Sequence, residues 1–384
     1  MQVHDLALQR NKYKHLSDEE WRWMLQQVEG RERTADKLPT FAAIDDWWYP
    51  VRLSCEQCSS ELTARYKREI LNLQSPISNG QLVDLTGGYG VDSYFLSQAF
   101  EHADYVEQDA ELCRIAEHNF SLQQSAISGQ ISVHRNTAED FLQTAERFDL
   151  IYLDPARRDT HGGKVFRLED CTPNVVELLP TLLQHLNPNG PIMLKLSPML
   201  DITQALSRLS SLSWDIHIVA VKNEVKEVLL LSGGNQQITA IDLAKKEQVF
   251  SFTKSEEMMA NPDILTSATQ LPSFIYEPNA AILKGGAYRL VAERFGLQKA
   301  DTNTHLYFSD RLHSDFPGRV FRTLPFREGN GVGSLTNANV LVRNYPMTAE
   351  QLKKKLHLRD GGTVFVIGCR VAGKPVILQA ERVI

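Results

Sequence analysis

The sequence has little of what marks an exported, membrane-bound or metal-binding protein. Its five cysteines are odd in number and irregularly spaced, so no disulfide framework follows from them. Cys55 and Cys58 form a single CxxC pair without the other two ligands of a zinc site, so we expect structural thiols and no metal. The N-terminal stretch is polar, and no run of about 18 apolar residues occurs, which argues against a signal peptide or a membrane span. We therefore expect a soluble cytoplasmic protein.

The charge of the chain is unevenly distributed. The net charge is -6, but residues 300–384 contain 12 Lys and Arg against 7 Asp and Glu, or +5, which leaves 29 against 40, or -11, for the rest. A basic end on an acidic chain is typical of nucleic-acid contact, although a basic surface is often only a solvated face. Charge alone leaves both interpretations open.

The first half of the chain shows two patterns of apolar residues. Residues 1–75 carry them at helical spacing, as around Trp21, and predict a helical N-terminal lid. In this part Ser54, with Gln57 three residues later, predicts a capping box that opens a helix. Residues 76–235 alternate short apolar runs with amphipathic stretches, which predicts an α/β domain with a parallel sheet covered by helices.

The second half of the chain contains strands in other arrangements. Only Lys222 to Lys226 separate the last two apolar runs of the predicted sheet, too few residues for a crossover helix, so these runs form an antiparallel hairpin. Residues 236–328 predict a small α+β domain with one clear helix over 281–297. Residues 329–384 predict a βαββ module, whose helix begins at Thr348 with Gln351 as its capping partner.

A glycine-rich turn follows the first strand of the predicted sheet. Glycine permits a sharp turn and the close approach of a ligand, although a tight loop between a strand and a helix has the same composition. The order TGGYG does not match the dinucleotide fingerprint GxGxxG. The candidate cofactor-binding residues in this turn are Asp84, Thr86, Gly87, Gly88 and Gly90.

The next two strands supply further candidate cofactor contacts. Glu107 ends the second strand 23 residues after Asp84, where a carboxylate can accept both ribose hydroxyls of an adenosine. The remaining candidates at these strand ends are Gln108, Thr137, Ala138 and Glu139. Together these motifs resemble the class I S-adenosylmethionine (SAM) dependent methyltransferases, because the turn is similar to their first motif and Glu107 to their ribose-binding acid. The resemblance implies a Rossmann-like sheet and SAM as the cofactor.

The fourth strand ends in Asp-Pro-Ala-Arg-Arg, which resembles the (D/N)PP(aromatic) tetrapeptide of enzymes that methylate amines of nucleic acids. The resemblance implies that Asp154 and the Pro155 carbonyl accept the two hydrogens of an exocyclic amine. Such positioning accounts for much of the rate of methyl transfer. Arg157 and Arg158 would hold the base or its phosphate, since a guanidinium plane can stack on a base and pair with phosphate.

The same tetrapeptide is similar to DP(P/A)R in enzymes that methylate C5 of pyrimidines and need a cysteine nucleophile after the fifth strand. This chain has Lys195-Leu196-Ser197-Pro198 there, and a serine without a nearby base cannot replace a thiolate. Cys171 is the nearest cysteine in sequence, with a buried structural thiol as the alternative. We expect Lys195 and Ser197 to contact the substrate, because the C-terminal rim of an α/β sheet binds ligands.

Small hydroxyl side chains gather at a predicted helix start just before the sheet. They either cap this helix or form a loop that folds over SAM. For the second role Ser60 and Thr63 are the candidates.

The whole chain resembles the bacterial SAM-dependent methyltransferases that carry a ferredoxin-like insert and end in a THUMP-like domain. The segments that carry this resemblance are EQCSSELTARYK, DLTGGYGVDS, YLDPARRD, KLSPMLD, YEPN and NVLVRNYP. Because THUMP domains bind structured RNA, the resemblance implies that the basic C-terminal module captures RNA. The expected phosphate contacts are Arg343, Lys353, Lys354 and Lys355, with Arg359 in support, and a solvated helix face is the alternative.

The sequence as a whole predicts a SAM-dependent methyltransferase that modifies a base nitrogen in structured RNA, such as tRNA or rRNA. One alternative is a methyltransferase that acts on a protein or a small molecule. Another is a non-catalytic RNA-binding protein with a degenerate SAM fold, since Thr86, Thr137 and Ala156 depart from the family pattern. A nicotinamide oxidoreductase disagrees with the glycine spacing and with the hairpin.

Overall fold

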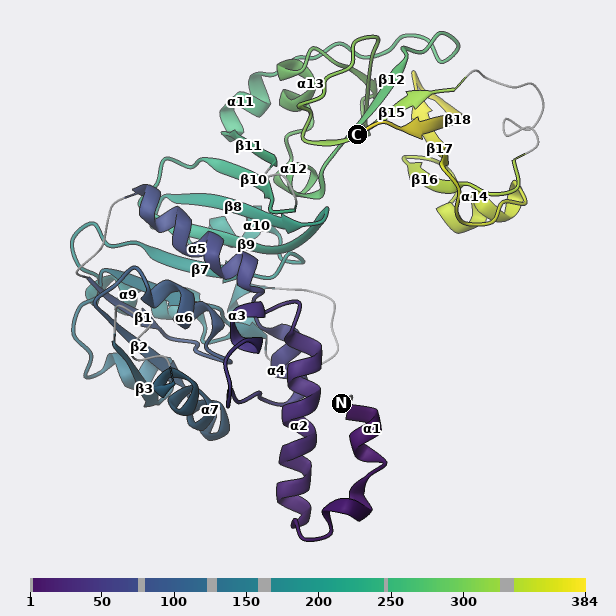
Figure 1. Ribbon diagram of the computed structural model, residues 1–384. Coiled ribbons are helices and arrows are strands. Elements are labelled where there is room, and N and C mark those ends of the chain that lie inside the picture. Colours follow the sequence, from purple (N-terminus) through teal and green to yellow (C-terminus); the bar gives the residue numbers. More distant parts are fainter. Residues whose placement is uncertain (1–2, 75–79, 123–129, 158–166, 245–247, 325–334) are drawn as a thin grey trace. The chain divides into compact units, whose positions relative to one another are not determined.

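The computed structural model describes residues 3–74, 80–122, 130–157, 167–244, 248–324 and 335–384 (Figure 1). Within these ranges, no helix is long and apolar enough to cross a membrane. The chain divides into two compact units, which are Met1–Asp215 with Val228–Asn235 and Ile216–Glu227 with Gln236–Ile384.

The N-terminal part of the first unit is helical, as predicted. Its elements are α1 (Val3–Ala7), a 3-10 turn (Arg10–Tyr13), α2 (Asp18–Thr34), α3 (Pro39–Ala42), α4 (Arg52–Gln57) and α5 (Glu61–Gln74). The capping box predicted at Ser54 is wrong, because Ser54 lies inside α4. The next helix starts later, where the Ser60 hydroxyl accepts the backbone N–H of Thr63 at 3.2 Å.

A nine-stranded sheet follows in the order β11-β10-β8-β9-β7-β4-β1-β2-β3. Its strands are β1 (Gln81–Asp84), β2 (His102–Glu107), β3 (Gln130–Arg135), β4 (Leu150–Leu153), β7 (Ile192–Leu196), β8 (Trp214–Val221), β9 (Glu224–Ser232), β10 (Ile238–Asp242) and β11 (Gln248–Phe252). The first five of these pair in parallel, whereas β9 pairs antiparallel with β7. Lys222 and Asn223 make the predicted hairpin turn with φ of 53° and 63°, as a tight two-residue turn requires. The Rossmann-like sheet is thereby confirmed.

Helices and two short strands connect the strands of the first unit. Strands β1, β4 and β7 are almost wholly buried, as expected where helices cover both faces of a sheet, whereas β3 at the end of the sheet has no buried residue. The connecting elements are α6 (Val91–Ser97), α7 (Ala110–Ser121), α8 (Ala138–Leu142), β5 (Ala156–Arg157), a 3-10 turn (Leu168–Asp170), β6 (Cys171–Thr172), α9 (Val175–Gln184) and α10 (Ile202–Arg208). Of these, α6 packs against α5.

The second unit contains a seven-stranded sheet in the order β13-β14-β12-β15-β18-β17-β16. Its strands are β12 (Phe274–Pro278), β13 (Gln298–Asp301), β14 (Thr304–Ser309), β15 (Gly318–Thr323), β16 (Asn339–Arg343), β17 (Val364–Val371) and β18 (Lys374–Arg382). Its helices are α11 (Lys254–Met259), α12 (Ala280–Gly285), α13 (Leu290–Arg294) and α14 (Ala349–Lys355). The predicted βαββ module is present as β16-α14-β17-β18, and α14 begins at the predicted Thr348–Gln351 capping box.

Two features of this unit differ from the sequence analysis. Strands β10 and β11, in residues that the sequence placed in the small α+β domain, instead extend the large sheet, because β10 covers the edge of β8 from Ile216 to Ala220. The single helix predicted over 281–297 is two helices, α12 and α13. Gly286 between them has φ of +83°, a conformation that ends a helix and that glycine adopts easily.

A buried carboxylate connects three strands of the seven-stranded sheet. Glu277 of β12 is 2% exposed and forms ion pairs with Arg319 of β15 and, at 2.5 Å, with Arg343 of β16. Two guanidinium groups thus compensate the desolvation of one carboxylate.

Candidate active site

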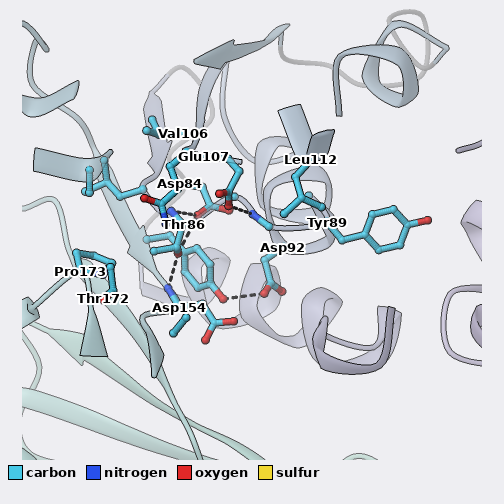
Figure 2. A pocket seen from close by; sticks show the side chains of 18 of the residues that line it. Asp84, Thr86, Tyr89, Asp92, Val106, Glu107, Leu112, Asp154, Thr172 and Pro173 are labelled. Carbon is cyan, nitrogen blue, oxygen red and sulfur yellow. Dashed lines mark hydrogen bonds between the residues drawn. The ribbon is translucent and has the colours of Figure 1, made fainter. Parts of the chain in front are cut away.

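A cavity of about 460 Å³ lies at the C-terminal ends of the parallel strands β1 to β4. Cavities for small ligands span roughly 300–1,000 Å³, so this one can hold a nucleoside-sized molecule. The glycine-rich turn, Glu107, residues 137–139 and Asp154 line it, together with Ser54 and residues 57–59 of the helical N-terminal part. Figure 2 shows the side chains of ten lining residues with labels.

The turn after β1 is fixed by backbone conformation and by packing. Gly88 and Gly90 have φ of +55° and +80°, which lie in the left-handed region that glycine adopts freely. Gly87 is required by space, since a Cβ there would lie 2.2 Å from the ring of Tyr105. The Tyr105 hydroxyl in turn donates to the Gly88 carbonyl at 2.6 Å. The turn therefore presents one rigid wall to the cavity.

Asp84 lies buried at the base of this turn. Its carboxylate accepts the hydroxyl of Ser93 and the backbone N–H of Thr86, the latter at 3.0 Å. Burial raises the pKa of Asp84 to about 7, because these hydrogen bonds only partly offset the lost solvation and the carboxylates of Asp92 and Asp154 raise it further. A cationic group that binds near Asp84 would favour its charged form.

Both carboxylate oxygens of Glu107, the predicted ribose-binding acid, are held by backbone amides. Its carboxylate accepts the backbone N–H of Gly88 through Oε2 and that of Asp109 through Oε1, both at 2.9 Å. Each carboxylate oxygen has a second lone pair, so two acceptors remain for the hydroxyls of a ligand. Gln108 after β2 and residues 137–139 after β3 continue the wall of the cavity. The Thr137 hydroxyl itself caps α8 by accepting the N–H of Asp140 at 3.1 Å.

Asp154 faces the cavity directly after β4. Its backbone N–H donates to the Thr86 hydroxyl at 2.6 Å, and its side chain is 38% exposed. Oδ2 of Asp154 accepts a hydrogen bond from the ammonium of Lys195. The described lining of the cavity includes neither Pro155 nor Ser197. The Arg157 side chain and the whole of Arg158 lie outside the described residues.

Behind Asp154 is a charged network that sequence analysis missed. Lys195 lies 3.9 Å from Asp92 Oδ2, and the ammonium of the fully buried Lys67 lies 3.1 Å from Asp92 Oδ1. Burial raises the pKa of Asp92, but Lys67 and Lys195 outweigh it and lower the pKa to about 2. Asp92 is therefore ionised.

Two hydroxyls complete the shell of Asp92. Those of Tyr152 and Ser59 each donate to its Oδ2 at 2.7 Å, and Figure 2 shows Asp92 beside the cavity. A signal for this network was present in the sequence, since Lys67 stands three residues after Ala64 on the apolar face of a helix. A lysine in that position needs a buried anionic partner.

The structure places Ser60 and Thr63 at the start of a helix and not in the described lining of the cavity. The Ser60 hydroxyl caps α5, while Thr63 is 2% exposed and donates to the Ser60 carbonyl at 3.1 Å. The neighbouring Ser59 lines the cavity instead. The Ser60 hydroxyl therefore caps a helix, and a role of Ser60 and Thr63 in binding SAM stays a prediction.

The basic residues of the C-terminal module differ in their partners. The guanidinium of Arg343 pairs with the buried Glu277. Lys353 pairs with Glu350 at 3.1 Å and with Asp360 at 2.8 Å. The exposed members of the predicted set are Lys354, Lys355 and Arg359.

Comparison with known proteins decides the family. Family models for a ferredoxin-like domain and for a THUMP-like domain match residues 274–317 and 319–382. The crystal structure of a proposed methyltransferase from Porphyromonas gingivalis W83 is 31% identical, with a TM-score of 0.83, and the similarity covers 96% of this chain and 92% of that one. This chain belongs to the SAM-dependent methyltransferases with a C-terminal THUMP-like domain. An uncharacterised SAM-dependent methyltransferase from Mycobacterium tuberculosis is 22% identical to it over 359 residues, 91% of this chain and 92% of the relative.

The cavity of this methyltransferase fits SAM, the cofactor of its family. Glu107 offers two acceptors where a ribose would lie, and the turn before it admits close approach because its glycines carry no side chain. Asp84, at the base of this turn, lines the same cavity. No group of three or more His, Cys, Asp or Glu side chains suited to a metal ion occurs in the described part of the chain.

Proposed function

We propose that this methyltransferase modifies an exocyclic amine of a base in structured RNA. The observation that carries the proposal is the placement of Asp154, whose carboxylate is exposed to the cavity while its backbone is bound to the glycine-rich turn. An ionised carboxylate accepts hydrogen bonds and donates none, so it selects a group that carries hydrogens. An exocyclic amine is such a group.

Some residues of the site would bind the cofactor, and others would bind the substrate. Bound SAM supplies an electrophilic methyl group attached to sulfur. Glu107 would accept the ribose hydroxyls, and residues 137–139 would border the adenine. Asp154 and the Pro155 carbonyl would accept the amine hydrogens and direct the nitrogen lone pair toward the methyl group. The nitrogen would gain the methyl group as the methyl–sulfur bond breaks, S-adenosylhomocysteine would leave, and one proton would pass from the nitrogen to solvent.

The choice of RNA as the substrate is supported by the C-terminal module. The THUMP-like match covers residues 319–382, in the part of the chain with a net charge of +5. Lys354, Lys355 and Arg359 are exposed there and can meet phosphates. We expect the charge reversals Lys354→Glu and Lys355→Glu together to weaken RNA binding and to reduce its salt-dependence slope by about 2. Lys254→Glu, at an exposed lysine of α11, is the matched control.

The test of the function is methyl transfer from radiolabelled SAM to total small RNA, to a protein extract and to a small-molecule extract. We expect label in RNA with the wild type, strongly reduced but measurable label with Asp154→Ala, and unchanged labelling with Asp36→Ala, at an exposed aspartate. Nucleoside digestion then identifies the methylated atom, which should be an exocyclic nitrogen. Label in protein or a small molecule alone would refute the RNA substrate. Binding of SAM and RNA without any label would favour a non-catalytic protein.

A further inference from the structure

The position of Lys195 is not that of a substrate contact. Its side chain is only 11% exposed, and the described lining of the cavity does not include it. Its ammonium lies between two carboxylates, bonded to Asp154 Oδ2 and 3.9 Å from Asp92 Oδ2. Both carboxylates line the cavity, so Lys195 joins two lining residues without belonging to the described lining itself.

Asp92, the second carboxylate beside Lys195, is held in place by buried contacts. Asp92 is held by the ammonium of Lys67 and by the hydroxyls of Tyr152 and Ser59, and all four side chains are buried. These residues come from α6, α5, β4 and the segment before α5. Because the lysine side chain is flexible, the position of its ammonium depends on the anions that it pairs with. An Asp92 held in one position therefore also holds the ammonium of Lys195.

We infer that Lys195 is a positioning residue for methyl transfer. It holds Oδ2 of Asp154, so that Oδ1 is the oxygen presented to the amine of the substrate. Among the residues that the structure describes, none donates a hydrogen bond to Asp154 Oδ1. The inference rests on the proposed function, in which Asp154 accepts the amine. Lys195 acts through Asp154 and does not touch the substrate.

A double-mutant cycle tests this inference on the full chain, with the RNA fraction that the wild type labels as substrate. We expect Lys195→Met to lower kcat by about 10²-fold, as for a misplaced catalytic group, with KM for SAM nearly unchanged. In the Asp154→Ala background the same substitution should lower kcat no further, because both changes remove one interaction. Lys195→Arg should recover part of the activity, since a guanidinium also pairs with a carboxylate.

SAM affinity, measured by calorimetry, reports whether each variant keeps the cavity intact, and Lys14→Met serves as a surface control. A kcat of Lys195→Met equal to that of the wild type overturns the inference. Effects of Lys195→Met and Asp154→Ala that multiply also overturn it, because Lys195 would then act by another route. Full activity of Asp154→Ala alone overturns the proposed role of Asp154 and the inference with it, so the two failures are distinguishable.

Discussion

Replacing Lys67 by methionine should destabilise the protein strongly, although Lys67 itself is not part of the described lining of the cavity. Lys67 is 0% exposed, and its ammonium is 3.1 Å from Asp92. Removing one partner of a buried ion pair lowers the free energy of unfolding by about 3–5 kcal/mol. Lys195, at 3.9 Å, and two hydroxyls remain around Asp92, so we expect about 3 kcal/mol, the low end of that range.

The pKa of Asp92 gives a second, smaller value for the stability that the partners of Asp92 contribute. Its fall from 3.8 to about 2 corresponds to roughly 2 kcal/mol of stabilisation of the ionised form, shared by all its partners. The value of about 3 kcal/mol for the loss of the partner is the better guide to the effect of Lys67→Met. The smaller value already includes the unfavourable burial of the carboxylate. A lowered pKa in the folded state stabilises the protein above the unfolded value of 3.8, and this stability is lost as pH falls toward 2.

The assay is urea unfolding of the wild type, Lys67→Met and Lys67→Met with Asp92→Asn. The single variant should lose about 3 kcal/mol near neutral pH and less below about pH 4, where protonation relieves the stranded carboxylate. The double variant should recover most of the loss, because the amide oxygen at residue 92 can still accept from Tyr152 and Ser59. A single variant within about 1 kcal/mol of the wild type would refute the reasoning.

Three further predictions concern the cofactor wall. At alkaline pH, Asp84→Asn should raise the unfolding temperature above that of the wild type. The raised pKa of about 7 means that the wild type loses stability as pH rises from 3.8 to 7, and no gain in unfolding temperature at alkaline pH would contradict this. The same variant should bind SAM more weakly. Glu107→Gln should weaken SAM binding by roughly ten- to a hundredfold in calorimetry, with Glu111→Gln, an exposed acid, as the control. Gly87→Ala should lower the free energy of unfolding by about 1–3 kcal/mol in urea, since its Cβ would meet the Tyr105 ring, and an unchanged value would mean that the ring moves freely.

The large sheet could be predicted from the sequence because its signals are local. Apolar runs alternate with amphipathic stretches, and only a short segment separates the last two runs. The position of Glu107 could be predicted for the same reason, since it depends only on where the second strand ends. The break at Gly286 had a local signal too, in a pair of glycines, but helical periodicity on both sides of it concealed the interruption.

The network behind Asp154 could not be predicted by the same means. Lys67 and Asp92 are 25 residues apart, and only the packing of α5 on α6 brings them together. Lys195 lies near the end of its strand, as predicted. The pattern of apolar residues in that strand does not tell whether the ammonium turns to the cavity or to a buried carboxylate. Ser59 and Ser60 are adjacent hydroxyls, and their different roles depend on where α5 begins.

The ion pairs of Glu277 bear on how the C-terminal half of this family can evolve. The carboxylate belongs to the segment matched as ferredoxin-like, whereas Arg319 and Arg343 belong to the segment matched as THUMP-like. Both segments also contribute strands to a single sheet. Recombination between them would leave a buried anion without its cations and a sheet with new open edges. An exchange of one segment without the other would therefore have to replace all three charged residues at once.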